Sequence, residues 1–181
     1  MTNDTCRSIF WAQVTMQNEI SSASTKVKGI PDNSSIIVPR LICKDPGAEI
    51  DFCVAVFEAK VLNRRPGPNA TVWHGLLTIR EEMLMIEAEV PGLPGKAPAP
   101  NGSSPVMIFV YVPDVDRAVG LALERGAKVV MAAQNQFWGD RSAVIMDPAG
   151  HVWTVASRIE ETTAQERTDR WANILSEREK T

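Results

Sequence analysis

An order of secondary-structure elements that occurs twice is the feature that most constrains the fold of this chain. Residues near 36–89 and residues near 106–157 each have the pattern of a strand, a helix and three further strands. Both predicted helices run into the tripeptide Ala-Lys-Val, at residues 59–61 and 127–129. A unit that repeats at about 70 residues shares an interface with its own copy. The sequence therefore predicts an α+β domain of two β-α-β-β-β modules.

The first module is expected to begin with a strand over residues 36–43. Pro39 within it lacks the N–H of a ladder donor and so favours an edge position or a bulge. Asp45 is the expected N-cap of the helix that follows, with Pro46 at its first position. This helix carries one apolar stripe for packing on a sheet, formed by Ile50, Cys53, Val54 and Phe57. Three strands are expected to follow, over residues 60–65, 71–79 and 82–89.

The second module follows residues 90–105, whose five prolines and three glycines predict a linker. Its first strand is expected over residues 106–112, and Gly126 is expected to end the helix as a C′ glycine. The apolar stripe of that helix is Val115, Ala118, Val119, Ala122 and Leu123. A strand over residues 128–133 and a strand–turn–strand segment over residues 138–156 complete the module.

The strand–turn–strand segment contains the most distinctive motif of the chain. Its turn is Asp147-Pro148-Ala149-Gly150, in which proline fixes one φ and glycine allows a positive φ. An Asp-Pro-x-Gly-His-x-Trp turn after a Trp-Gly-Asp-Arg at residues 138–141 resembles one branch of the vicinal oxygen chelate superfamily. That superfamily contains glyoxalase I, extradiol dioxygenases and bleomycin-resistance proteins, and the branch is the group similar to the phosphonate-operon protein PhnB. The resemblance covers residues 36–160 and implies a mixed sheet curled into a half-barrel, with the active site in its cup.

The resemblance also implies a divalent metal site, and this chain departs from that pattern. Enzymes of the superfamily hold the metal with four side chains, typically His or Glu, from the first and last strands of each module. Counted from the motif, these positions fall on or near Val38, Glu87, Met107 and Thr154. One carboxylate does not make a metal site, and Val and Met are not ligands for a hard cation. We therefore expect no bound metal and no cofactor.

The two histidines lie outside those four positions. His151, in the turn, is expected to be structural, whereas His74 could line a pocket or lie in the core or on the surface. The three cysteines, Cys6, Cys43 and Cys53, lack CxxC spacing, which favours reduced thiols packed as small hydrophobes. A Cys–His dyad with His74 is disfavoured because Cys53 belongs to an apolar helix stripe. The sequence contains no nucleophile elbow, P-loop or dinucleotide fingerprint, so catalytic residues stay unassigned.

Aromatic and methionine side chains on the predicted strands could line a pocket for a small, partly apolar ligand. Part of this set must face the concave side of the sheet, because alternate strand residues face opposite ways. The candidates are Trp73, His74, Met85, Glu87, Met107, Phe109, Trp138 and Trp153. The alternative is that they fill the core between sheet and helices. Two functions stay open: a metal-independent small-molecule binding protein, and a lyase, isomerase or dioxygenase of the same superfamily.

Composition excludes several classes of partner. The chain has 181 residues, 44% of them hydrophobic, which is enough to bury one well-formed core. A formal net charge of −3 without a basic excess argues against nucleic acid. No apolar run reaches the roughly 18 residues of a membrane span. The first residues lack the basic and apolar regions of a signal peptide, so a cytoplasmic location is expected.

The N-terminal residues 1–35 are rich in Ser, Thr and Asn and are expected to form an extension outside the domain. Residues 8–16 could form a strand. Exposed aromatic residues would be unusual on a purely disordered tail, so Phe10 and Trp11 are expected to dock, for instance on a partner subunit.

Residues 161–181 predict a C-terminal amphipathic helix. Thr163 followed by Glu166 matches a capping box, which marks a helix start. The helix could pack on the outside of its own domain, or Trp171 could anchor an oligomer contact. The apolar residues at both chain ends, and the pairing that the resemblance implies, predict a homodimer.

Overall fold

The computed structural model describes residues 28–99 and 104–179. The strand expected over residues 8–16 and the docking of Phe10 and Trp11 lie outside the described residues.

The chain divides into two units, residues 1–34 and residues 35–181. In the first unit, Lys28 and Asp32 form an ion pair with Nζ and Oδ1 2.7 Å apart. Every helix and strand of the described residues belongs to the second unit. None of the described helices is long and apolar enough to span a membrane.

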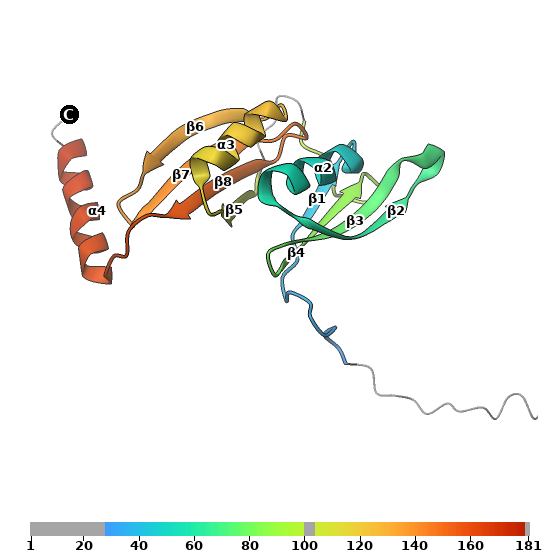
Figure 1. The fold of residues 1–181 in the computed structure, drawn as a ribbon, viewed down its shortest axis with the longest axis horizontal. Helices are drawn as coiled ribbons and strands as arrows, with labels where there is room; N and C mark the ends of the chain where they lie inside the picture. The colour runs from blue at the N-terminus through green and yellow to red at the C-terminus, as the bar shows by residue number, and fades with distance from the viewer. Residues whose placement is uncertain (1–27, 100–103, 180–181) are drawn as a thin grey trace, which may run out of the picture. The chain divides into compact units, whose positions relative to one another are not determined.

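The first module is a four-stranded mixed sheet with a helix on one side (Figure 1). Its elements are β1 (Arg40–Cys43), α2 (Pro46–Phe57), β2 (Lys60–Pro66), the short 3-10 helix η1 (Pro68–Ala70), β3 (Val72–Ile79) and β4 (Glu82–Ala88). The strand order is β1-β4-β3-β2, in which β1 runs parallel to β4 and the other pairs are antiparallel.

The second module repeats this plan, which confirms the predicted architecture. Its elements are β5 (Met107–Tyr111), α3 (Val115–Glu124), β6 (Lys128–Asn135), β7 (Asp140–Met146) and β8 (Val152–Arg158). The strand order is β5-β8-β7-β6, with β5 parallel to β8. Each module pairs only its own strands, so the strands form two four-stranded sheets instead of one continuous curled sheet. The described part of the predicted linker contains no helix or strand.

The first strand is shorter than the expected residues 36–43, because it begins only after Pro39. Proline cannot donate to the ladder, but its carbonyl still accepts a hydrogen bond from the N–H of Met85 at 3.0 Å. The strand lies at the edge of its sheet, which is one of the two positions that Pro39 favours. Ile36 and Ile37, before the strand, have exposed fractions of 85% and 82%.

The ends of the two sheet-packed helices follow the sequence signals. The Asp45 side chain caps α2 by accepting a hydrogen bond from the N–H of Ala48. Asp114 caps α3 in the same way, accepting from the N–H of Arg117. Gly126 follows α3 with a φ of 88°, the left-handed conformation that a C′ glycine supplies. Local capping chemistry therefore sets where each helix begins and where α3 ends.

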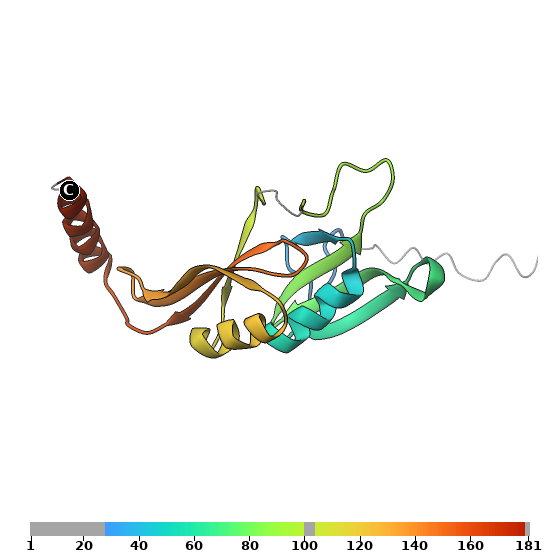
Figure 2. The ribbon, with the colours of Figure 1, turned by 90° about the horizontal axis from the view of Figure 1, so that it is seen from above.

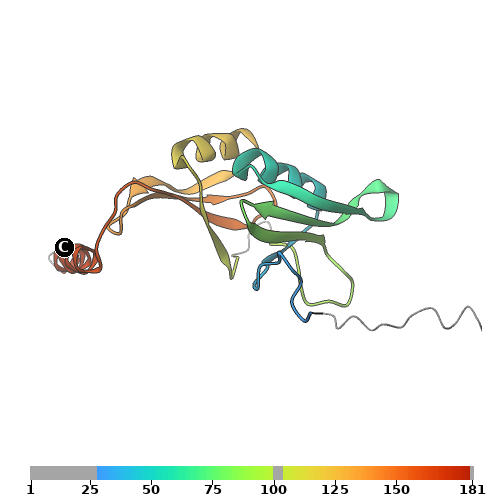
Figure 3. The same ribbon diagram turned by 60° about the horizontal axis from the view of Figure 1, so that its bottom comes forward.

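Helices α2 and α3 lie on the same side of the two sheets (Figure 3). Gly75 in β3 allows α2 to approach, because a Cβ at that position would collide with the side chain of Ile50. The ring of Phe57 on α2 lies 4.7 Å from that of Trp153 on β8, centroid to centroid. One apolar core therefore runs from the first module into the second.

The C-terminal helix α4 (Ala164–Arg178) begins with the predicted capping box, in which Thr163 and Glu166 bond each other's backbone N–H. None of its described side chains is buried, and the helix extends away from both sheets (Figure 2). Its aromatic contact is between Trp171 and Phe137, whose ring centroids lie 5.1 Å apart. Packing of α4 on its own domain is therefore limited.

Candidate ligand-binding face

The candidate site lies on the sheet faces that point away from α2 and α3, which we name the open faces. Strand alternation assigns side chains to them. In β3, Gly75 and the fully buried Leu77 face the helices, so His74 faces the open side. Cross-strand register places Glu87 of β4 directly opposite His74. Met85, two residues before Glu87, shares the same face.

A charged cluster occupies the open face of the first sheet. Arg40 of β1 lies in register with Met85 of β4, on the strand next to that of Glu87. Its Nε atom donates to Oε2 of Glu87 at 2.9 Å, and its Nη2 atom contacts the same oxygen. The other oxygen, Oε1, lies 2.9 Å from Nδ1 of His74. Partial burial opposes ionisation of Glu87, but the hydrogen bonds from Arg40 and His74 outweigh it and lower the pKa of Glu87.

An apolar row occupies the open face of the second sheet. Met107, Phe109 and Tyr111 alternate along β5 with exposed fractions of 53%, 49% and 49%, whereas Val110 between them is buried. The rings of Phe109 and Tyr111 lie 5.2 Å apart, centroid to centroid. Large apolar groups that are half exposed in an unbroken row provide the contact area that a partly apolar ligand needs.

A polar cluster ends this row at the start of β7. Asp140 is fully buried, and its Oδ2 atom accepts hydrogen bonds from Tyr111 Oη at 2.9 Å and from Trp138 Nε1 at 2.7 Å. Arg158 Nε lies 2.9 Å from Oδ1 of the same carboxylate. The hydrogen bond to Asp140 raises the pKa of the Tyr111 phenol. Two candidates therefore differ in role: Phe109 is available for contact, whereas Trp138 is held by the Asp140 carboxylate.

Two tryptophan candidates lie on the other side of the sheets. Trp153 is fully buried in the core beside Phe57, and its Nε1 atom donates to Asp147 Oδ2 at 2.6 Å. Trp73 has the same strand parity as Gly75, so it faces the helix side of β3. Trp153 therefore corresponds to the core alternative, whereas Trp73 keeps an exposed fraction of 38%, and the structure does not bring either of them together with the open-face residues.

A buried polar cluster joins the modules on the helix side. Cys43 Sγ lies 3.5 Å from His151 Nε2, and Cys53 Sγ lies 3.6 Å from Glu49 Oε1. The Asp147 side chain accepts the N–H of His151, which supports the structural role expected for this turn histidine. Burial raises the pKa of both thiols and lowers that of His151. A nucleophilic cysteine needs thiolate character, so this contact has a structural role.

The positions expected for metal ligands do not fit a metal ion. Val38 lies before β1, and Glu87 is paired through both oxygens. Met107 and Thr154 lie on the second sheet, where Phe109 is in register with Thr154. Among residues 28–99 and 104–179, no group of three or more His, Cys, Asp or Glu side chains is arranged to hold a metal ion.

Comparison with known proteins identifies the family. Residues 35–155 match the model of the Glyoxalase/Bleomycin resistance protein/Dioxygenase superfamily. The chain therefore belongs to this superfamily, as its repeated modules and its turn motif predict.

Proteins similar to this chain include one relative of known sequence and two solved structures. An uncharacterised protein of Mycobacterium tuberculosis (strain H37Rv) is 38% identical over 131 residues, which are 71% of this chain and 77% of the relative. The crystal structure of TioX from Micromonospora sp. ML1 is similar with a TM-score of 0.55 and 28% identity, covering 70% of this chain and all of TioX. FosX, a fosfomycin resistance protein of Listeria monocytogenes solved with Mn(II) and sulfate, has a TM-score of 0.53, 16% identity and coverage of 76% and 98%. This last likeness concerns the fold alone.

Proposed function

We propose that this protein binds a small, partly apolar molecule on its open faces without a metal ion. One observation supports this proposal above the others: the single carboxylate at an expected ligand position, Glu87, has both oxygens engaged by Arg40 and His74. A guanidinium therefore occupies the neighbourhood in which the superfamily's enzymes hold a cation. Removing Glu87 from this pairing to bind a metal would leave the Arg40 charge without its partner.

The two open faces offer complementary contacts to such a ligand. The row of Met107, Phe109 and Tyr111 offers apolar and aromatic area. His74 offers a directional polar group, because its Nδ1 atom is held by Glu87 and its Nε2 atom has no hydrogen-bond partner among the described residues. A few polar groups within a mostly apolar lining are typical of small-molecule sites.

Elemental analysis after dialysis without chelator, followed by titration with nickel, manganese, iron and zinc, tests the absence of a metal. The expected result is no stoichiometric metal. Stoichiometric metal that is lost in Glu87→Gln but kept in Glu89→Gln would overturn the proposal. Glu89 is a matched control because it follows the same strand and bonds the N–H of Ala97 rather than Arg40.

Binding itself is tested with the dye anilinonaphthalene sulfonate. Phe109→Ala should weaken dye binding, because it removes the central ring of the exposed row, whereas Val129→Ala on β6 should not. Equal effects of the two substitutions would contradict a site on this row.

We also propose that the protein forms a homodimer. Helix α4 has no buried side chain and presents Trp171 and Leu175 to solvent, with exposed fractions of 44% and 43%, and a Trp on a terminal helix is a typical interface anchor. Light scattering at micromolar concentration should show two chains, and a monomer would reject the proposal. Membership of the PhnB-like branch and a cytoplasmic location stay predictions of the sequence.

A second function, a lyase or isomerase that works without a metal, is favoured by one feature. His74 and Glu87 form a hydrogen-bonded pair of the kind in which a carboxylate orients an imidazole as a general base. If this function is correct, His74→Gln abolishes turnover of a substrate that still binds. If binding is the only function, His74→Gln changes affinity and no turnover is found in the wild type.

A further inference from the structure

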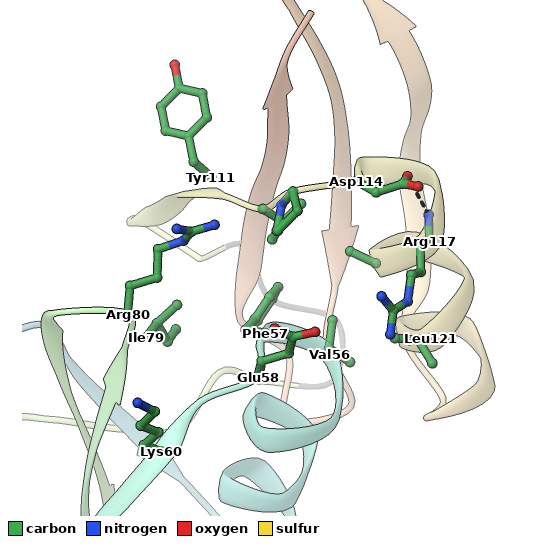
Figure 4. Close-up of a pocket in the computed structure, with 13 residues that line it drawn as sticks. Val56, Phe57, Glu58, Lys60, Ile79, Arg80, Tyr111, Asp114, Arg117 and Leu121 are labelled. Atoms are coloured by element: carbon green, nitrogen blue, oxygen red, sulfur yellow. Dashed lines mark hydrogen bonds between the residues drawn. The ribbon is translucent and has the colours of Figure 1, made fainter.

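A cavity lies on the helix side of the sheets, and Tyr111 is the one residue of the open-face row among those that line it. It has a volume of about 310 Å³ and lies between the end of α2, the β3–β4 turn and the start of α3 (Figure 4). Its apolar lining includes Val56, Phe57, Ile79 and Leu121. Tyr111 also borders it, but the Tyr111 ring points away from the cavity (Figure 4) and its hydroxyl bonds Asp140.

Two charged residues at this cavity hold a backbone conformation that favours glycine. Glu58, the residue that ends α2, has a φ of 56°, and Arg80, in the β3–β4 turn, has a φ of 55°. Side chains with a Cβ rarely adopt this left-handed region, and asparagine tolerates it better than Glu or Arg. Glycine would satisfy the backbone at both positions with less strain. The end of a helix and a two-residue hairpin turn each call for this conformation, and both residues line the same cavity.

Three basic side chains from different elements also line this cavity. They are Lys60 of β2, Arg80 of the turn and Arg117 of α3. Within the described residues none of the three has a carboxylate oxygen within 4.0 Å. By contrast, the arginines of the open faces, such as Arg40 and Arg158, are paired. The basic groups at this cavity are thus free to pair with an incoming anion.

The acidic groups at the cavity limit which anion fits. The Asp114 carboxylate already accepts the N–H of Arg117 as the cap of α3, at 3.0 Å. The Glu58 carboxylate adds a second negative charge to the lining. Because the two acidic groups offset part of the charge of the three basic ones, the lining should bind a monoanion in preference to a dianion such as a phosphate monoester. A carboxylate matches the planar fork of an arginine side chain.

We propose that this cavity binds a small carboxylate with an apolar body. Arg80, with Lys60 or Arg117, would hold the carboxylate, and the apolar body would contact Phe57 and Leu121. The volume is at the lower end of the usual range for ligand cavities, about 300–1,000 Å³, so the ligand is the size of a short fatty acid or an aryl carboxylate. This site is independent of the open faces and does not rest on the function proposed for them.

The test uses the full chain and octanoate as the probe, with affinity measured by calorimetry. Wild-type protein should bind octanoate, whereas octylammonium and inorganic phosphate should not compete for the site. Arg80→Gly should weaken octanoate binding about tenfold or more, since it removes a charge-assisted contact. Because glycine accepts the left-handed backbone, the same variant should unfold at no lower urea concentration than the wild type. Lost affinity can then be separated from lost folding.

Matched controls separate this site from the open faces. Arg178→Gln, at the exposed end of α4, should leave octanoate affinity unchanged, and at least one of Lys60→Gln and Arg117→Gln should reduce it. An affinity that Arg80→Gly leaves unchanged, or equal binding of octylammonium, would overturn the proposal. Octanoate binding that is lost in Phe109→Ala but kept in Arg80→Gly would place the probe on the open face and would also overturn it, leaving the proposed function standing.

Discussion

Replacing Glu49 by Gln should change how the stability of the fold depends on pH. The Glu49 side chain lies on α2 with an exposed fraction of 2%, at the junction between the modules. Burial is the largest cause that raises the pKa of Glu49 from 4.5 to about 9, and the charge of Asp147 and a hydrogen bond with it add to the effect. We therefore expect Glu49 to be protonated in the folded protein at neutral pH, with its O–H donated to Asp147.

The magnitude follows from proton linkage. Between pH 4.5 and about 9 the folded state binds one more proton at Glu49 than the unfolded state does. The free energy of unfolding therefore falls by about 1.4 kcal/mol per pH unit in this window. The contribution is fully present below pH 4.5 and is lost by about pH 9, a total on the order of 6 kcal/mol. Gln cannot ionise, yet its amide N–H can donate to Asp147 in place of the carboxyl O–H, so this slope should vanish in Glu49→Gln.

Urea unfolding of the wild type and of Glu49→Gln between pH 5 and 9 measures this difference. Other titrating groups, including His151, act in both proteins and largely cancel when the two slopes are subtracted. Glu124→Gln is the matched control because Glu124 ends α3 on the exposed surface, and it should keep the wild-type slope. Parallel stability curves for the wild type and Glu49→Gln would refute a protonated Glu49 in the folded state.

Three further predictions concern other contacts. Tyr111 is the single tyrosine of the chain, so its phenolate absorbance should rise only above the ordinary pH of about 10, and Asp140→Asn should shift that rise to lower pH; an unshifted titration would contradict the hydrogen bond. Gly139→Ala should lower the free energy of unfolding by about 1–3 kcal/mol in urea titrations, because φ is 95° and the new Cβ would collide with the carbonyl of Glu160. Thr163→Ala should destabilise α4 by about 1 kcal/mol, seen as faster amide exchange in α4 with unchanged exchange in the sheets, since α4 has no buried side chain.

The repeated modules could be predicted because each depends on local signals. Helix caps such as Asp45 and the paired Thr163 and Glu166 act within a few residues, and the structure has them where the sequence predicts. Apolar residues at every second position then identify the strands, and apolar residues at helical spacing identify the helices that pack on the sheets. The late start of β1 shows the limit: Pro39 indicates an edge or a bulge, but the ladder alone decides where pairing begins.

The candidate site was less predictable, because it depends on which face each strand residue takes and on its neighbours across the sheet. Trp153 and Phe109 are both aromatic strand residues, but only the register of β5 against β8 separates the core from the open face. Arg40, which sequence reasoning did not select, could have been found as the one charged residue in an apolar strand. The contact between Cys43 and His151 spans 108 residues and joins two modules, so no local pattern indicates it.

Strand alternation also explains how one pair of sheets can hold the modules together and still leave a surface for ligands. In β1, Cys43 points into the junction between modules, while Arg40 points to the open face. In β8, Trp153 fills the core, and Thr154 beside it faces the other way. The polar contacts of Glu49 and Cys43 that join the modules all lie on the helix side. Substitutions on the open face therefore leave this junction intact, so ligand preference can change there while the fold is retained.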